Sequence, residues 1–105
     1  MDRLGKYEPP VRRNIKSQFR GLLRTCSSEY DAPSMEQIRR SFEFLVVHGG
    51  ADQSIHGQSL LESSTQLATM AVKELGLDAL GVSASIICYT VELNKIPIER
   101  VKKDV

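Results

Sequence analysis

Few side chains in this sequence have the chemistry to bind a metal ion or to attack a substrate. The histidines, cysteines and carboxylates that could do so are His48, His56, Cys26, Cys88, Asp52, Glu62 and Glu92. They do not form a His-Glu-x-x-His or Cys-x-x-Cys spacing, which would place ligands on one face of a helix or in one turn. His48 and His56 flank a glycine-rich stretch that could bring them together, although ordinary solvated loop histidines have the same pattern. Residue types alone therefore predict no activity.

Three other features could carry chemistry, and each has a simpler structural interpretation. Cys88 lies in an apolar stretch, and we expect it to be a buried small hydrophobic residue, because nothing nearby in sequence would lower its pKa. Gly49-Gly50 is not followed by Lys-Ser/Thr and does not predict a phosphate loop. The basic residues near the start indicate either a solvated helix face or a phosphate-binding surface. They are Arg12, Arg13, Lys16, Arg20 and Arg24.

The stretch from Val82 to Leu93 carries two of these groups, Cys88 and Glu92, and its spacing predicts a helix. Two apolar rows run along it. The first row is Leu80, Ala84, Ile87 and Val91, and the second is Val82, Ile86, Tyr89 and Leu93. Only small or mildly polar residues separate the rows. A helix that is apolar nearly all round is usually buried among other helices. We therefore expect a central buried helix over this stretch, begun by Asp78 as N-cap.

The rest of the chain predicts amphipathic helices around that centre. One begins at the prolines Pro9 and Pro10 and buries Ile15, Phe19, Leu22, Leu23 and Cys26. A loop covers 27–33, and a capping box at Ser34 and Gln37 begins the next helix, with Met35, Ile38, Phe42, Leu45 and Val46 inward. Ser59 caps a helix burying Leu60, Leu61, Leu67, Ala68, Ala71, Val72 and Leu75, which Gly76 ends. Pro97 begins a short last helix with Ile98 and Val101 inward.

The expected fold is all-α, a compact bundle of about five helices. Residues 1–8 are expected to be flexible, and residues 9–105 to form one helical domain. We expect a surface loop over 51–58, and no stretch alternates with period two, so no sheet is expected. Gly21 lies within a predicted helix, where it suggests a close packing contact.

Composition limits the possible partners and the compartment. The 105 residues are enough for one small domain. Fourteen basic residues against thirteen acidic ones predict no general nucleic-acid or membrane surface, although the start of the chain is locally basic. No apolar run reaches membrane-spanning length, and the two distant cysteines predict a reducing, cytoplasmic location.

Residues 37–105 resemble the N-terminal HD-type hydrolase domain of RelA/SpoT homologues, the enzymes that make and degrade the alarmone (p)ppGpp. The family reads Phe-Glu-Phe-Ala-x-x-Ala-His, then Arg-Lys-Ser-Gly-Glu-Pro-Tyr-Ile-x-His-Pro, then Leu-Leu-His-Asp-Val-Val-Glu-Asp-Thr. The first block begins here at Phe42-Glu43-Phe44-Leu45 and runs without a gap to Gly57. The third falls on Ile86-Ile87-Cys88-Tyr89-Thr90-Val91-Glu92-Leu93-Asn94, and 96–101 is similar to the family's Ile-Thr-Leu-Glu-Asp-Ile. The resemblance implies an HD-like helical domain.

The positions that hold manganese in that family have other residues here. The first metal histidine is matched by Ser63, and the His-Asp pair by Cys88 and Tyr89. Gly49 replaces the histidine that ends the first block, and of the Glu-Asp pair only Glu92 is kept, beside Leu93. The Arg-Lys that packs near the nucleotide becomes Ser54-Ile55, and Glu-Pro becomes Gln58-Ser59. We expect no manganese, because these side chains do not supply the ligands that it needs and Tyr89 would fill much of its space.

The resemblance therefore implies a pseudo-hydrolase domain with a structural or regulatory role in the bacterial stringent response. It would be part of a longer chain, a possible GTP pyrophosphokinase whose adjoining synthetase domain is the expected partner. No catalytic, nucleotide-binding or metal residue, no cofactor, no nucleic-acid contact and no membrane contact is expected of this domain. Two alternatives stay open. One is an active metal-dependent (p)ppGpp phosphohydrolase with displaced ligands such as His48, His56 and Glu92, and the other is an unrelated helical interaction module.

Overall fold

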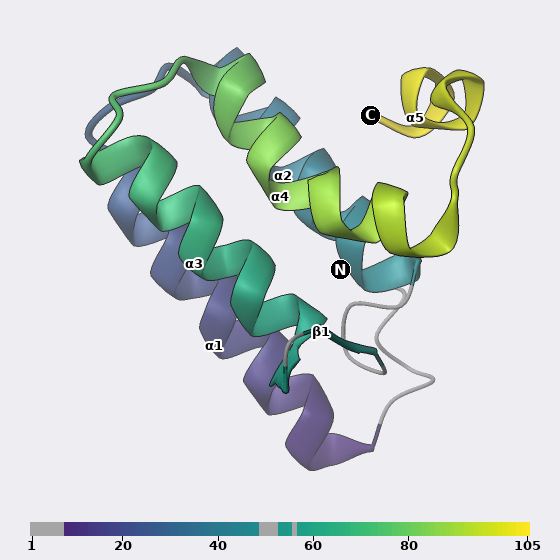
Figure 1. Cartoon of the computed structure of the whole chain (residues 1–105). Helices are drawn as coiled ribbons and strands as arrows, with labels where there is room; N and C mark the ends of the chain where they lie inside the picture. The colour runs from purple at the N-terminus through teal and green to yellow at the C-terminus, as the bar shows by residue number, and fades with distance from the viewer. Residues whose placement is uncertain (1–7, 49–52, 56) are drawn as a thin grey trace.

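Five helices account for most of residues 8–48, 53–55 and 57–105, which the computed structural model describes. In chain order the elements are α1 (Pro9–Cys26), α2 (Ala32–Val47), β1 (Ser54–Ile55), β2 (Gln58–Ser59), α3 (Leu60–Lys73), α4 (Ala79–Asn94) and α5 (Ile98–Asp104). The predicted class, a small all-α bundle, is confirmed. Figure 1 shows α1 beside α3 and α2 beside α4.

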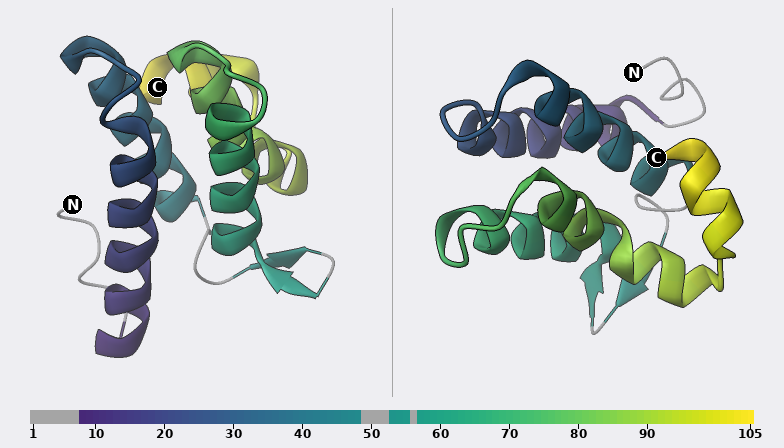
Figure 2. Two further views of the ribbon diagram at one scale, coloured as in Figure 1. Left: turned by 90° about the vertical axis from the view of Figure 1, so that its left-hand side faces the viewer. Right: turned by 90° about the horizontal axis from the view of Figure 1, so that it is seen from above.

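The long helices form two layers, with α1 and α2 in one and α3 and α4 in the other (Figure 2, right). The layers meet where α1 packs on α3 and where α2 packs on α4. The core between them contains aliphatic side chains and the rings of Phe42 and Phe44; the aliphatic residues include Ile15, Leu22, Ile38, Leu45, Leu60, Leu61, Val82 and Ile86. The Phe42 ring lies 4.9 Å from that of Phe19, centroid to centroid, so α1 and α2 also contact each other. Most of the predicted inward faces of α1 and α2 thus form the core. Leu23 of α1 and Leu67 of α3 were also predicted to be buried, but both are only half-buried and lie outside the core.

Short polar side chains begin three of the helices. Ser59 accepts a hydrogen bond from the Glu62 amide at 3.0 Å, and Asp78 accepts one from the Gly81 amide at 2.9 Å, so both predicted caps are confirmed. The capping box predicted at Ser34 is wrong. Asp31 is the N-cap of α2, and its carboxylate accepts from the Ser34 amide at 3.0 Å. Pro33 lies in the first turn, where a missing N–H costs no hydrogen bond, so the helix can begin before it.

A small hairpin replaces part of the loop expected over 51–58. β1 and β2 pair antiparallel, with Ser54 opposite Ser59 and Ile55 opposite Gln58. Gly57 turns the chain between them with a φ of 78°, a value that glycine adopts without steric cost. The expectation of no sheet is therefore wrong at this point. Strands of two residues are too short to produce a detectable alternation of apolar and polar residues, and positions 51, 52 and 56 lie outside the described residues.

The expectation of a centrally buried α4 is only half right. One face packs on α2 and α3 and buries Ala79, Val82, Ser83, Ile86, Ile87 and Thr90. On the other face Leu80 is 66% exposed, and Ala84, Cys88 and Leu93 are also exposed. The predicted rows are wrong in this respect, because neighbouring helices cover only one side of α4 among the described residues.

Three smaller expectations are also wrong. Leu75 lies beyond the end of α3 and is 62% exposed, because the helix stops at Lys73 and the chain turns through Gly76 with a φ of 60°. Ile98 in the first turn of α5 is 59% exposed, although Val101 does pack against the core as predicted. A Cβ added at Gly21 would meet nothing within 4 Å, so no close contact explains that glycine.

Candidate functional site

The three segments that carry the family resemblance fall on neighbouring elements. Residues 42–47 form the second half of α2 and His48 is its C-cap, residues 54, 55 and 57–63 belong to the hairpin and the start of α3, and residues 86–94 form the second half of α4. Helix α4 packs on both α2 and α3, and both strands of the hairpin contact α3. Segments that are separated by about forty residues in sequence therefore meet at one end of the bundle.

Asn94, at the end of α4, holds this end together through its carboxamide. Its Nδ2 donates to the His48 carbonyl at 3.1 Å and to Gln53 Oε1 at 2.9 Å, and also lies 3.0 Å from the Thr90 carbonyl of its own helix. Gln53 Nε2 donates back to Asn94 Oδ1 at 2.8 Å. We call these bonds between Asn94, Gln53 and His48 the Asn94 clasp. The clasp joins the ends of α2 and α4 to the residue that precedes the hairpin.

Ser63, which stands where the family has its first metal histidine, turns its hydroxyl toward the hairpin. The hydroxyl donates to Gln58 Oε1 at 3.1 Å, and the side chain is half-buried. Glu62 is also half-buried, and its backbone amide is used by the Ser59 cap. The Ser63 oxygen is thus part of the packing between α3 and the hairpin.

Cys88 is exposed, so the expectation that it would be buried is wrong. Its thiol donates a long hydrogen bond, 3.6 Å, to the Ser85 carbonyl one turn earlier in α4. Partial burial raises the pKa of the Cys88 thiol, and the Glu92 charge raises it further, which together outweigh the backbone hydrogen bonds that lower it. The thiol is therefore protonated at neutral pH.

The other residues of the third segment also lie in different environments from one another. Tyr89 is half-buried and packs against the core, whereas Glu92 and Leu93 are exposed. The side-chain hydrogen bonds of Ser63 and Cys88 go to separate neighbours. Across residues 8–48, 53–55 and 57–105, no group of three or more His, Cys, Asp or Glu side chains is placed to hold a metal ion. A hydroxyl, a protonated thiol and a phenol do not fit a divalent cation that requires converging oxygen or imidazole ligands.

The remaining candidate residues are scattered. Ser54 is exposed and Ile55 half-buried in β1, where the family has Arg-Lys. The His48 ring packs on Phe44, with centroids 4.3 Å apart. Cys26 is buried in the core, and this burial raises the pKa of its thiol. Gly49, Asp52 and His56 lie outside the described residues.

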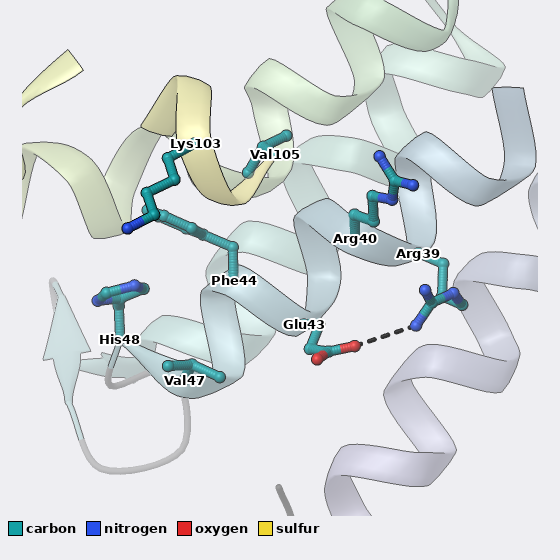
Figure 3. Close-up of a pocket in the computed structure, with 8 residues that line it drawn as sticks. All are labelled: Arg39, Arg40, Glu43, Phe44, Val47, His48, Lys103 and Val105. Carbon is teal, nitrogen blue, oxygen red and sulfur yellow. Dashed lines mark hydrogen bonds and ion pairs between the residues drawn. The ribbon is translucent and has the colours of Figure 1, made fainter. Parts of the chain in front are cut away.

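A pocket of about 350 Å³ between α2 and α5 was not predicted from the sequence (Figure 3). Its lining includes Arg39, Arg40, Glu43, Phe44, Val47, His48, Lys103 and Val105. The basic pairs at 39–40 and 102–103 were the only available signal. Arg39 is already bonded to Glu36 at 2.6 Å and to Glu43 at 3.0 Å, and the Glu36 hydrogen bond raises the arginine pKa. In Figure 3 the Arg40 and Lys103 side chains point in different directions, so these cations do not converge on one anion.

Comparison with protein-family models, with curated proteins and with solved structures finds no match to this chain. Among the described helices, none is both long and apolar enough to cross a membrane.

Proposed function

We propose that this chain is a catalytically degenerate HD-type domain of a RelA/SpoT-like guanosine polyphosphate enzyme. In this proposal the domain neither hydrolyses nor tightly binds (p)ppGpp, and it contributes to alarmone metabolism through structure or regulation. The longer cytoplasmic chain would add a synthetase domain, a GTP pyrophosphokinase, as its immediate partner.

The Asn94 clasp is the observation that best supports this proposal. Its three residues belong to, or directly adjoin, the three sequence blocks that resemble the family, and the clasp joins those blocks at one end of the bundle. An active domain of this type needs the same three segments side by side in order to assemble a metal site.

The side chains at the metal-binding positions of the family lack the chemistry that catalysis needs. A metal-bound water becomes a nucleophile at neutral pH because the cation lowers its pKa. Ser63, Cys88 and Tyr89 do not hold such a cation, and the lone carboxylate of Glu92 is exposed. Without Arg-Lys at Ser54-Ile55, the cationic groups that pack near the nucleotide are missing as well. Binding and hydrolysis are therefore expected to be lost together.

Manganese loading and (p)ppGpp turnover test the proposal together. Purified protein is incubated with Mn²⁺, Zn²⁺ or Fe²⁺, desalted and measured by elemental analysis, and release of pyrophosphate from ppGpp is followed in parallel. A RelA/SpoT homologue with its complete His and His-Asp residues serves as the positive control. We expect no stoichiometric metal and no turnover. One tightly held equivalent, with hydrolysis that is lost in His48→Ala or Glu92→Ala, would instead establish the active enzyme with displaced ligands.

The reading frame beyond the codon for Val105 tests the family assignment separately. A nucleotidyl-transfer domain encoded there is the expected result. A frame that encodes an unrelated domain would favour the helical interaction module, whatever the metal content of this domain.

A further inference from the structure

The outer face of α1 concentrates positive charge that the whole chain does not have. The helix carries Arg12, Arg13, Lys16, Arg20 and Arg24, and its eighteen residues include no aspartate or glutamate. Five of the fourteen basic residues of the chain thus lie on one helix, and the rest of the chain is net negative although the total is +1. The expectation of no nucleic-acid contact was based on the overall charge of the chain. That overall charge does not reveal that the positive charge is concentrated on α1.

The core fixes the direction in which these cations point. Ile15, Leu22 and Cys26 of α1 are buried, so the opposite side of the helix faces outward along its whole length (Figure 2, left). Arg13, Arg20 and Arg24 are all exposed there, seven and four residues apart. These spacings are two turns and one turn of helix, so the three guanidinium groups form a row about 16 Å long.

Among the residues that the structure describes, no acidic side chain pairs with this row. Within the part of the chain that the structure describes, none of the five α1 cations forms an ion pair. Arg39 and Arg40 of α2 differ in this respect, since both contact Glu36. The charge of α1 is therefore available to an external anion.

A groove whose exposed lining is mainly apolar, with side-chain hydroxyls and amides at its rim, runs beside the row. It has a volume of about 380 Å³ and is lined by Ser17, Gln18, Gly21 and Leu22 of α1 and by Thr65, Gln66 and Thr69 of α3. Gly21 keeps the groove open because it has no side chain. The amides of Gln18 and Gln66 can both donate and accept hydrogen bonds. Cations with uncharged polar groups beside them are the usual contacts to phosphates and sugars of nucleic acid.

We propose that this face, the arginine row with the groove beside it, docks on the sugar–phosphate backbone of a nucleic-acid duplex. Arginine suits phosphate because its planar guanidinium donates two parallel hydrogen bonds. A single strand is a poorer fit, because no aromatic side chain is exposed on α1 for bases to stack on. A membrane surface is a poorer fit too, since the apolar face of α1 is buried in the core.

The proposal does not depend on the assignment to the RelA/SpoT family, and its test is separate from metal content and turnover. Fluorescence anisotropy is measured with a labelled RNA duplex and a DNA duplex of the same sequence over a salt series. The α1 variant is Arg13→Gln/Arg20→Gln/Arg24→Gln. The matched control is Lys73→Gln/Lys95→Gln/Lys102→Gln, which removes the same charge from exposed positions on other elements.

We expect parent affinity to fall with salt, with a slope of about −2 to −3 in log K against log salt for three or so phosphate contacts. The α1 variant should lose at least about tenfold in affinity at low salt and most of that slope, whereas the control should keep both. Similar binding of RNA and DNA would support contacts to phosphates alone, and preference for RNA would add contacts from the groove to 2′-hydroxyls.

Nuclear magnetic resonance of the parent chain gives a readout that needs no variant. Addition of duplex should shift the backbone amides of residues 12–24 more than those of α4. The proposal would be overturned if the two triple variants lost affinity equally, or if the parent did not bind duplex at low salt. Tighter binding to a single strand or to poly-glutamate than to duplex would also overturn it.

Discussion

The two faces of α4 do not divide cleanly into an apolar buried face and a polar exposed face. The face toward α2 and α3 contains Ser83 and Thr90, whose hydroxyls are buried and have no hydrogen-bond partner among the described residues. The opposite face exposes Leu80 and Cys88. The comparison shows that side-chain shape and the position of neighbouring helices, rather than polarity alone, determine which side of an apolar helix is buried.

The largest expected difference between the faces is in stability. Ile86 on the inner face is almost fully buried, so Ile86→Ala should lower the free energy of unfolding by about 2–5 kcal/mol through lost burial and a residual cavity. Leu80→Ala on the outer face should change it by no more than about 0.5 kcal/mol. Urea unfolding followed by circular dichroism measures both. Equal losses would mean that the outer face is as well packed as the inner one.

Thr90→Val should raise the free energy of unfolding, whereas Ile86→Ala lowers it. Valine has nearly the same shape and removes a buried hydroxyl that has no partner, so we expect a gain of about 1 kcal/mol. Thr65→Val is the matched control, because the Thr65 hydroxyl is also buried but donates to the Leu61 carbonyl at 2.8 Å. The control should show no gain. If both variants are stabilised equally, the absence of a partner for Thr90 is not the cause.

The same contrast explains which parts of the fold could be predicted from the sequence. Ser59 and Asp78 were identified as caps because capping depends on residues three positions apart. The exposure of Leu80 and Cys88 could not be predicted, since apolar residues occur on all sides of α4 and the pattern does not indicate which side faces inward. Asp31 was missed because Ser34 offered a competing local signal.

The candidate positions were proposed from the sequence, whereas the contacts around them could not be. The positions Ser63, Cys88 and Tyr89 came from the resemblance to a family motif. The Asn94 clasp depends on two contacts, from Asn94 to Gln53 and to His48, which lie 41 and 46 positions earlier in the sequence. Neither spacing nor composition indicates which side chains will meet over such sequence separations.

Asn94→Ala tests the clasp and should have a smaller effect than the core variants. The carboxamide is exposed, so its loss should cost about 0.5–1 kcal/mol in unfolding free energy. Hydrogen exchange should rise mainly at the Leu60 amide, which donates to the Gln53 carbonyl at 2.8 Å. Asn14→Ala, an exposed asparagine on α1, is the control and should leave that amide unchanged. Unaltered exchange in Asn94→Ala would show that the clasp does not hold the hairpin.

Thiol labelling should distinguish the exposed face of α4 from the core, with almost no effect on stability. Cys88 is exposed on α4 and Cys26 is buried on α1, so Cys88 should react with a disulfide reagent at least about tenfold faster in the native protein. Burial raises the pKa of both thiols above the ordinary 9.0, and only the thiolate attacks. The Cys88 rate should therefore still rise about tenfold per pH unit between pH 7 and pH 8. Cys88→Ser should leave one slow thiol, which reacts only as the protein unfolds. A fast thiol that persists in Cys88→Ser would place Cys26 at the surface, and the packing of α1 against the core would have to be revised.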